Sequence, residues 1–132
     1  MAHRLFIDAN VLFSAAYREQ AGVGRLWQVP GAALVTSTYA IEEATRNLSE
    51  ESQRGRLQDL LRMMEVTLAG SLAPELMEGI ALPDKDWPIL GAAVTTRATH
   101  LITGDRQHFG PFFGEYLLGV LVLPPGDYLR SA

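Results

Sequence analysis

The sequence predicts an α/β fold, a three-layer α/β/α sandwich around a central, mainly parallel sheet. Short apolar runs rich in β-prone residues alternate along the chain with longer patterns typical of helices. Strands that are separated by helices pair in parallel, and the helices then cover both faces of the sheet. The chain has 132 residues, of which 48% are hydrophobic, which is enough for one core but not for two. We therefore expect a single domain over residues 1–132.

The first half of the chain begins with a short strand. Residues 5–7 are apolar and β-prone and are followed at once by Asp8, a pattern typical of a buried strand that ends in a polar loop. A second apolar run, residues 32–35, predicts the next strand. Ser37 or Thr38 can cap the helix that follows it. Helices are predicted over residues 11–19, 21–29 and about 38–48.

The second half continues the alternation. Apolar residues recur at intervals of three and four, as in an amphipathic helix, at Leu57, Leu60, Leu61 and Met64. After a stretch rich in Gly and Pro, Asp86 opens a further helix, whose apolar stripe is Ile89, Leu90, Ala93 and Val94. Two more strands are predicted over residues 100–103 and 120–123. A short last helix follows two prolines and ends near Arg130.

Composition excludes several classes of protein. The net charge is −4, from 15 acidic and 11 basic residues, whereas proteins that hold nucleic acid by bulk electrostatics are basic. The absence of cysteine excludes disulfides and thiolate metal sites. No apolar run approaches the roughly 20 residues of a membrane-spanning helix, and no apolar signal region opens the chain. We therefore expect a cytoplasmic protein that does not enter a membrane.

Two acidic residues come directly after predicted strands. Asp8 follows the strand over residues 5–7, and Asp105 follows Gly104 after the strand over residues 100–103. The carboxyl ends of parallel strands meet at one edge of the sheet, where α/β proteins bind their ligands. Two carboxylates at that edge repel each other unless a cation lies between them. The structural alternatives stay open: Asp8 can cap the next helix, and Asp105 can be an ordinary turn residue.

Two further segments carry candidate acids. Asp86 lies three and four residues before apolar positions of its helix, so it extends the buried stripe, although a capping Asp is an equally complete explanation. Asp84 is a secondary candidate, as a ligand or as a loop acid. Glu42 and Glu43 point about 100° apart on one helix, so only one of them can face a common site. A solvated glutamate is the alternative for either residue.

Together, the acids predict a metal site at one edge of the sheet. Asp8, Glu43, Asp86 and Asp105 come from four segments that the predicted topology brings together. Clusters of oxygen ligands suit Mg²⁺ or Mn²⁺. Such a site can activate water and stabilise the leaving oxygen of a phosphodiester.

Taken in order, these segments resemble the four motifs of PIN-domain ribonucleases. The residues that carry the resemblance are Asp8 to Leu12, Val35 to Ser37 with Glu43 six residues after the serine, Asp86 with Ile89 and Leu90, and Leu101 to Asp105 with Phe109. The tail, residues 122–129, is similar to the closing strand and short helix of one branch of the family. The resemblance covers nearly the whole chain.

The resemblance implies a flavodoxin-like or Rossmann-like sandwich and an Mg²⁺- or Mn²⁺-dependent endoribonuclease whose ligands are the four acids. Many short members are VapC-type toxins, so it also implies an RNA substrate, a small antitoxin protein as partner and a homodimer. Asn10 and Thr103 match polar positions that support the metal site. Ala9 departs from the hydroxyl residue common after the first acid, which removes the hydrogen bond that such a hydroxyl makes.

Other residues near the motifs have open interpretations. Arg106, beside Asp105, is a candidate phosphate contact, with a solvated arginine as the alternative. His108 is close enough in sequence to reach the site, but a lone histidine usually packs or lies exposed, so no catalytic role is assigned to it. Four aromatic residues fit either a partner-binding face or, more commonly, the core: Trp27, Trp87, Phe112 and Phe113.

Two alternative functions are compatible with the fold. A non-catalytic domain could bind RNA or a protein, although it would have no physical reason to keep four mutually repelling acids. A phosphatase with an aspartyl nucleophile needs a second Asp two residues after the first, where this chain has Asn10. No G-x-x-x-x-G-K-[ST] loop occurs in the sequence, which argues against a nucleotide-binding protein of that type.

Overall fold

The computed structural model describes residues 2–68 and 70–132. These residues form a six-stranded sheet in the order β3-β2-β1-β4-β6-β5. The strands are β1 (Arg4–Ile7), β2 (Ala33–Ser37), β3 (Glu65–Thr67), β4 (His100–Ile102), β5 (Tyr116–Leu117) and β6 (Val120–Leu123). Neighbouring strands pair in parallel except β5, which is antiparallel to β6. The predicted, mainly parallel sheet is confirmed.

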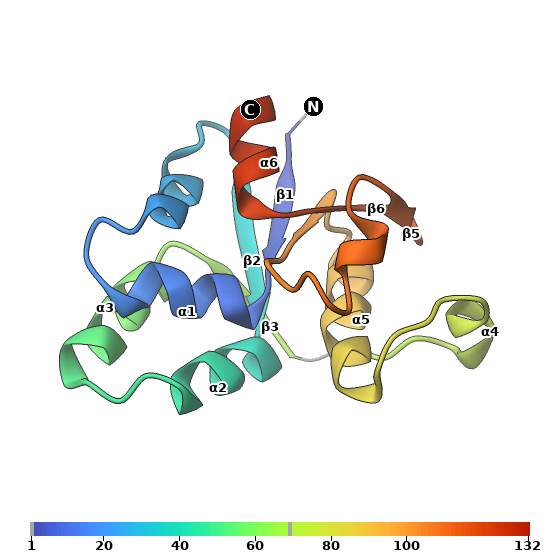
Figure 1. The fold of residues 1–132 in the computed structure, drawn as a ribbon, viewed down its shortest axis with the longest axis horizontal. Coiled ribbons are helices and arrows are strands. Elements are labelled where there is room, and N and C mark those ends of the chain that lie inside the picture. The colour runs from blue at the N-terminus through green and yellow to red at the C-terminus, as the bar shows by residue number, and fades with distance from the viewer. Residues whose placement is uncertain (1, 69) are drawn as a thin grey trace.

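Helices cover both faces of this sheet (Figure 1). They are α1 (Ala9–Tyr17), α2 (Thr38–Arg46), α3 (Glu51–Leu61), α4 (Pro74–Met77), α5 (Trp87–Thr95) and α6 (Pro125–Ser131). Three 3-10 segments accompany them, η1 (Gly22–Gln28), η2 (Asp84–Asp86) and η3 (Gly110–Phe112). In Figure 1, α1 and α3 lie on one side of β1 and β2, and α5 lies on the other. The arrangement is the predicted three-layer sandwich.

The strand order changes direction between β1 and β4. From β1 the chain moves outward to β2 and β3, and it then returns to place β4 on the other side of β1. The register pairs Ile7 with Ile102, and the amide of Asp8 donates to the carbonyl of Ile102 at 3.1 Å. Asp8 and Thr103 therefore leave the sheet side by side, at the switch point where such folds bind ligands.

The central strands are buried on both faces. Leu5, Phe6 and Ile7 of β1 and Leu101 and Ile102 of β4 are fully buried. Strands of this kind read as continuous apolar runs in the sequence, because helices cover both sides of a parallel sheet. The buried strands β1 and β4 thus end at the switch point, and their packing holds the backbone in place there.

Several predicted elements differ from the structure at the edges. The two edge strands, β3 and β5, were not expected, because β3 is three mostly exposed residues long and β5 has only two. The helix predicted over residues 21–29 is the 3-10 segment η1, in which Gly22 and Gly24 disfavour a regular α-helix. Helix α3 ends at Leu61 and leaves Met64 outside it.

The four aromatic residues predicted to lie either in the core or on a partner-binding face pack against the core. Trp27, Trp87, Phe112 and Phe113 are half-buried and contact the main hydrophobic cluster. The indole N–H of Trp27 donates to the carbonyl of Leu60 at 3.2 Å, and that of Trp87 donates to Leu82 at 3.2 Å. All four therefore pack at the margin of the core. Within the described ranges, no helix has both the length and the apolar character to cross a membrane.

A close backbone contact holds α5 in place, and it predicts a large cost for a small substitution. A Cβ at Gly91 would lie 2.5 Å from the carbonyl oxygen of Gly70. Because backbone cannot yield easily, Gly91→Ala is expected to lower the free energy of unfolding by about 1–3 kcal/mol. Gly55 on α3 has open space around it, so Gly55→Ala is expected to raise the same quantity by about 0.5–1 kcal/mol. Urea denaturation of both variants in metal-free buffer checks the opposite signs.

Candidate functional site

Asp8 lies at the junction of β1 and α1 and uses both carboxylate oxygens. Oδ1 accepts a hydrogen bond from the amide of Ala9 at 2.6 Å. Oδ2 accepts from the hydroxyl of Thr103 at 2.7 Å and from the side-chain amide of Asn10 at 3.3 Å. The residue is only 4% exposed. The capping role is therefore present at one oxygen, while the other oxygen joins a network between the two strand ends.

Thr103 and Asn10 connect the ends of β1 and β4. The buried hydroxyl of Thr103 donates to Asp8 and accepts from the amide of Asp105 at 3.2 Å. The Asn10 side chain donates to the same hydroxyl at 3.3 Å, and its carbonyl oxygen accepts from the amide of Gly104 at 2.8 Å. These hydrogen bonds link the segments that carry Asp8 and Asp105.

Asp105 divides its oxygens between a turn and the site. Oδ1 accepts from the backbone amides of Gln107 and His108, both at 3.0 Å. Oδ2 lies 3.2 Å from Nδ1 of His108. The turn role and the site role therefore coexist, because the turn uses only one oxygen.

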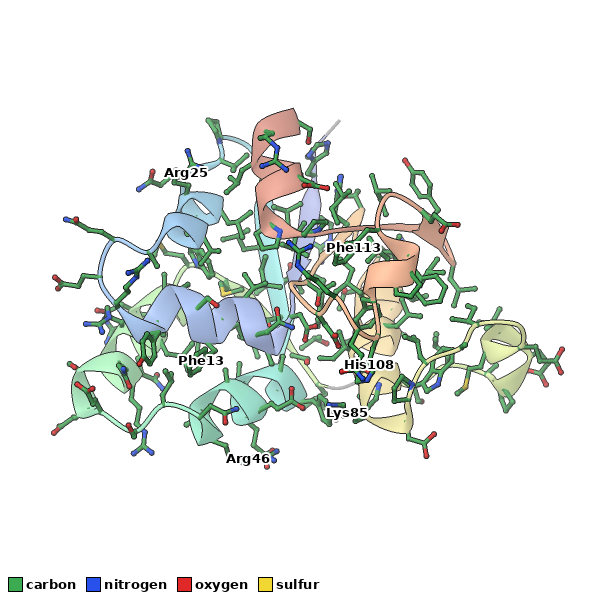
Figure 2. The ribbon with its side chains drawn as sticks, viewed as in Figure 1. Phe13, Arg25, Arg46, Lys85, His108 and Phe113 are labelled. Atoms are coloured by element: carbon green, nitrogen blue, oxygen red, sulfur yellow. The ribbon has the colours of Figure 1, made fainter. Side chains whose placement is uncertain are left out.

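Asp86 occupies the N-cap position of α5, but its side chain does not cap the helix. Its carboxylate accepts no hydrogen bond from the first turn of the helix, so the capping explanation is wrong. Oδ2 lies 3.0 Å from Nδ1 of His108, at an angle unsuited to a hydrogen bond. Among the described residues, these two atoms are the buried side-chain polar atoms without a hydrogen-bond partner. Figure 2 shows His108 and Lys85, the neighbour of Asp86, at the same end of α5.

Helix α2 is held where Glu43 can face the same edge. Its N-cap is Ser37, whose hydroxyl accepts from the amide of Ala40 at 3.2 Å. The hydroxyl of Tyr39 donates to the carbonyl of Lys85 at 2.8 Å, which ties α2 to the segment that carries Asp86. The predicted cap is confirmed, and the helix lies against both β2 and the start of α5.

Glu43 lines a pocket that reaches the end of β1. This pocket has a volume of about 400 Å³ and is lined by Ala9, Asn10, Phe13, Glu43, Ala44 and Asn47. Glu42 is exposed and lies 3.7 Å from Arg46 in an ion pair, on the other side of the helix. Of the two adjacent glutamates, Glu43 is therefore the one directed toward the acids.

The carboxylates affect one another electrostatically. The pKa of Asp8 is raised from 3.8 to about 6: burial raises it most, hydrogen bonds from Thr103 and Ala9 lower it, and the charges of Glu43 and Asp86 raise it further. Burial also raises the pKa of Asp86; His108 opposes that rise, while Asp105 and Glu43 add to it. Asp8, Glu43, Asp86 and Asp105 are thus near enough to affect one another's charge. Among the described residues, only Asp86 and Asp105, together with His108, bring ligand atoms within 4.8 Å of one another.

The residues present fit a divalent cation. Asp86, Asp105 and His108 each offer a ligand atom within 4.8 Å of the others. Asp8, with its raised pKa, and Asp86, with its unpartnered oxygen, are costly to keep ionised in a buried site without a positive charge. A cation would neutralise the carboxylates and satisfy the free oxygen together. Oxygen ligands of this kind suit Mg²⁺ and Mn²⁺.

The remaining predicted residues lie at the margin of the cluster. Asp84 is exposed in η2, two residues before Asp86, and Arg106 is exposed beside Asp105. His108 is the member that sequence reasoning missed. The available signal was its spacing of three residues from Asp105, but that spacing alone does not separate a site residue from a packing histidine. The contact between Asp86 of η2 and His108 in the loop after β4 distinguishes the two.

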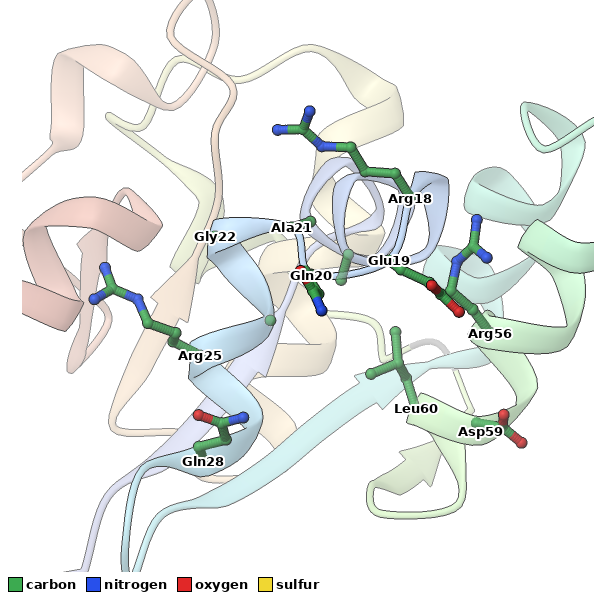
Figure 3. Close-up of a pocket in the computed structure, with 12 residues that line it drawn as sticks. Arg18, Glu19, Gln20, Ala21, Gly22, Arg25, Gln28, Arg56, Asp59 and Leu60 are labelled. Atoms are coloured by element: carbon green, nitrogen blue, oxygen red, sulfur yellow. The ribbon is translucent and has the colours of Figure 1, made fainter.

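A second and larger pocket lies away from the acids (Figure 3). It has a volume of about 720 Å³ and lies between the end of α1, η1 and α3. Its charges are mixed, and the Arg56 side chain donates to the carbonyls of Ala16 and Tyr17 at the end of α1. Figure 3 shows Arg18 and Arg25 extending away from Leu60. None of the clustered carboxylates lines this pocket, so the candidate site is the sheet edge.

Comparison with known proteins supports the fold. No protein-family model matches the chain, and no curated protein matches it. Among solved structures, it is similar to a chain in the crystal structure of VapBC2 from Rickettsia felis bound to a DNA fragment from their promoter. The identity is 12%, the match covers 92% of this chain and 98% of that chain, and the TM-score is 0.62. The predicted resemblance is thus confirmed at the level of the fold, a PIN-like α/β/α sandwich.

Proposed function

We propose that this protein is a metal-dependent endoribonuclease that hydrolyses RNA phosphodiester bonds. The observation that carries the proposal is the buried, unpartnered oxygen of Asp86, which faces Asp105 and His108 at the switch point of the sheet. An ionised oxygen left without a partner is costly in a folded protein. A bound cation removes that cost, and a phosphodiester is a substrate whose charge such a cation can stabilise.

Each residue has a separate task in the proposed reaction. Asp8, Asp86 and Asp105 hold the cation, and Thr103 and Asn10 orient the Asp8 carboxylate. When bound, the cation would supply charge stabilisation for the phosphate and activation of a water molecule. Glu43 lines the pocket beside Asn10, which supports a role for its carboxylate as the group that would accept a proton from water. Arg106 is exposed and follows Asp105 in sequence, which supports a role in which it would contact a neighbouring phosphate.

We also propose that the chain is the toxin of a toxin–antitoxin pair. The similar solved structure is described as VapBC2 with a fragment of promoter DNA. A small antitoxin protein is then the partner. Exposed apolar side chains, among them Leu68, Leu76 and Met63, support burial in a homodimer or against that partner. Light scattering of the purified chain tests the homodimer, and co-purification with the product of an adjacent small gene tests the antitoxin.

Cleavage of RNA by the full chain tests the activity. Wild type is expected to cut single-stranded RNA with Mg²⁺ or Mn²⁺ and to stop in excess chelator. Asp8→Asn and Asp105→Asn are each expected to lower the rate by at least about 100-fold, the upper end of the cost of losing a residue that only supports a metal ligand. Gel analysis of end-labelled RNA measures the rate.

Four outcomes would contradict this proposal. Cleavage that persists in chelator, or that survives both substitutions, would exclude the metal mechanism. Binding of RNA without cleavage by wild type would favour a non-catalytic domain. Hydrolysis of a generic phosphomonoester with RNA left intact would favour a phosphatase, although Asn10 occupies the position at which such enzymes need a second aspartate.

A further inference from the structure

We propose that His108 is itself a metal ligand, and that its nitrogen makes this site prefer a first-row transition ion such as Mn²⁺ or Co²⁺ over Mg²⁺. The inference rests on the metal site of the proposed function and specifies the ion that the site takes. The ligand atoms are Oδ2 of Asp86, Oδ2 of Asp105 and Nδ1 of His108, which all lie within 4.8 Å of one another.

The two distances from His108 within this triad are those of atoms that share an ion. Nδ1 of His108 lies 3.0 Å from Asp86 and 3.2 Å from Asp105. Two ligand atoms held at right angles, each about 2.1 Å from one ion, are about 3.0 Å apart. A direct hydrogen bond would give a similar distance, but it requires the nitrogen to point at the oxygen. The contact between His108 and Asp86 fails that requirement.

The burial of Asp86 provides a second, independent observation. The residue is only 8% exposed, yet Oδ2 has no hydrogen-bond partner among the described residues, and the same is true of Nδ1 of His108. Buried polar atoms in folded proteins are nearly always paired, and an ion is one of the explanations for an exception. Two unpaired atoms directed to the same place are explained together by one ion between them.

The backbone presents His108 to the site in a fixed position. Its amide donates to Oδ1 of Asp105 at 3.0 Å, and the next residue, Phe109, is fully buried in the core. The amide of Phe109 donates to the carbonyl of Asp105 at 3.2 Å. The imidazole therefore needs no rearrangement of the main chain to bind an ion. This is the arrangement expected of a ligand whose position is set before the ion binds.

An imidazole ligand changes the choice of ion. Mg²⁺ binds oxygen almost alone and keeps much of its water, whereas imidazole suits transition ions. Two carboxylates and one imidazole form a mixed set of ligands. Affinity for such a set rises along the series from Mn²⁺ toward Co²⁺ and Ni²⁺.

Metal binding measured without RNA tests the inference. The full chain is titrated with Mn²⁺, Co²⁺ and Mg²⁺ by calorimetry, and the Mn²⁺ form is examined by pulsed electron paramagnetic resonance for coupling to nitrogen. We expect wild type to bind Co²⁺ at least about tenfold more tightly than Mg²⁺. His108→Gln should weaken Co²⁺ binding by about 10–100-fold and Mg²⁺ binding by less than about threefold. His3→Gln is the matched control and should change neither.

Nitrogen coupling in wild type requires no variant, so the test holds even if His108→Gln fails to fold. Labelling the histidines with ¹⁵N should change the coupling frequency. Bound Mn²⁺ without nitrogen coupling overturns the ligand role of His108, and metal-dependent cleavage of RNA would then still support the proposed function. Nitrogen coupling in a protein that does not cut RNA would contradict the proposed ribonuclease function and support His108 as a metal ligand. Absence of binding by all three ions overturns both.

Discussion

Asp86→Asn is expected to lower metal-dependent cleavage of RNA by at least about 100-fold, whereas Asp84→Asn should leave the rate within about threefold of wild type. The two acids are two residues apart and undergo the same change of charge. Only Asp86 is buried with an unpartnered oxygen, while Asp84 is exposed in η2. A general effect of negative charge near the substrate would be similar for both residues. If Asp86 is a metal ligand and Asp84 is not, only Asp86→Asn lowers the rate of cleavage.

Calorimetry of metal binding gives the second measurement for this pair. Asp86→Asn should reduce the affinity for Mn²⁺ along with the rate, because asparagine cannot supply a charged ligand oxygen. Asp84→Asn should change neither quantity, and it also reports any loss of fold common to this segment. Equal losses in the two variants would contradict the assignment of Asp86, and a larger loss in Asp84→Asn would exchange their roles.

The centre of the fold follows from the sequence, and its edges do not. The apolar runs of β1 and β4 are continuous because both of their faces are buried, so composition alone reveals them. The edge strand β3 carries the exposed residues Glu65 and Val66, and its place is set by pairing with β2 rather than by its own pattern. Local sequence contains little information about a pairing between distant segments.

The same distinction applies to the site. Asp8 and Asp105 could be predicted, since residues that end neighbouring parallel strands must lie at one edge. Two features could not be predicted from spacing. Asp86 does not cap α5, and His108 lies against both Asp86 and Asp105. Both depend on how η2 packs beside the loop after β4, which is a tertiary contact between segments about 20 residues apart. Glu43 was predicted as a site residue from the resemblance to a family, because the local sequence does not distinguish a helical glutamate of a site from a solvated one.

Asp8→Asn is expected to stabilise the metal-free protein at pH 7.5 while it abolishes the proposed activity. Ionising a carboxyl whose pKa rises from 3.8 to about 6 on folding costs the folded state about 3 kcal/mol. Asparagine avoids that cost but has one oxygen where Asp8 has two, so one of its hydrogen-bond donors loses its acceptor, at about 1 kcal/mol. The free energy of unfolding should therefore rise by about 1–2 kcal/mol, measured by urea denaturation in chelator.

The pH dependence of this difference separates ionisation of Asp8 from simple repacking. Because folding raises the pKa, the protonated Asp8 stabilises the wild type fully below pH 3.8, and this contribution is lost as the pH rises through about 6. Wild type should be the more stable protein near pH 4 and the variant above pH 6, with the two curves crossing between. Asp84→Asn, at an exposed acid, should show no crossing. A constant difference across this range would contradict the raised pKa.

Addition of Mn²⁺ should reverse the order at pH 7.5. Any ligand that binds only the folded state stabilises it by an amount that rises with the logarithm of ligand concentration over the dissociation constant, about 2.7 kcal/mol at 100 times that constant. Wild type should gain this stabilisation, and Asp8→Asn should gain much less because it lacks a charged ligand. Such a reversal would mean that ionised Asp8 destabilises the protein only in the absence of a cation, and that a bound cation offsets the cost of its ionisation. Equal stabilisation of both proteins by Mn²⁺ would show instead that the ion binds elsewhere and that Asp8 has a purely structural role.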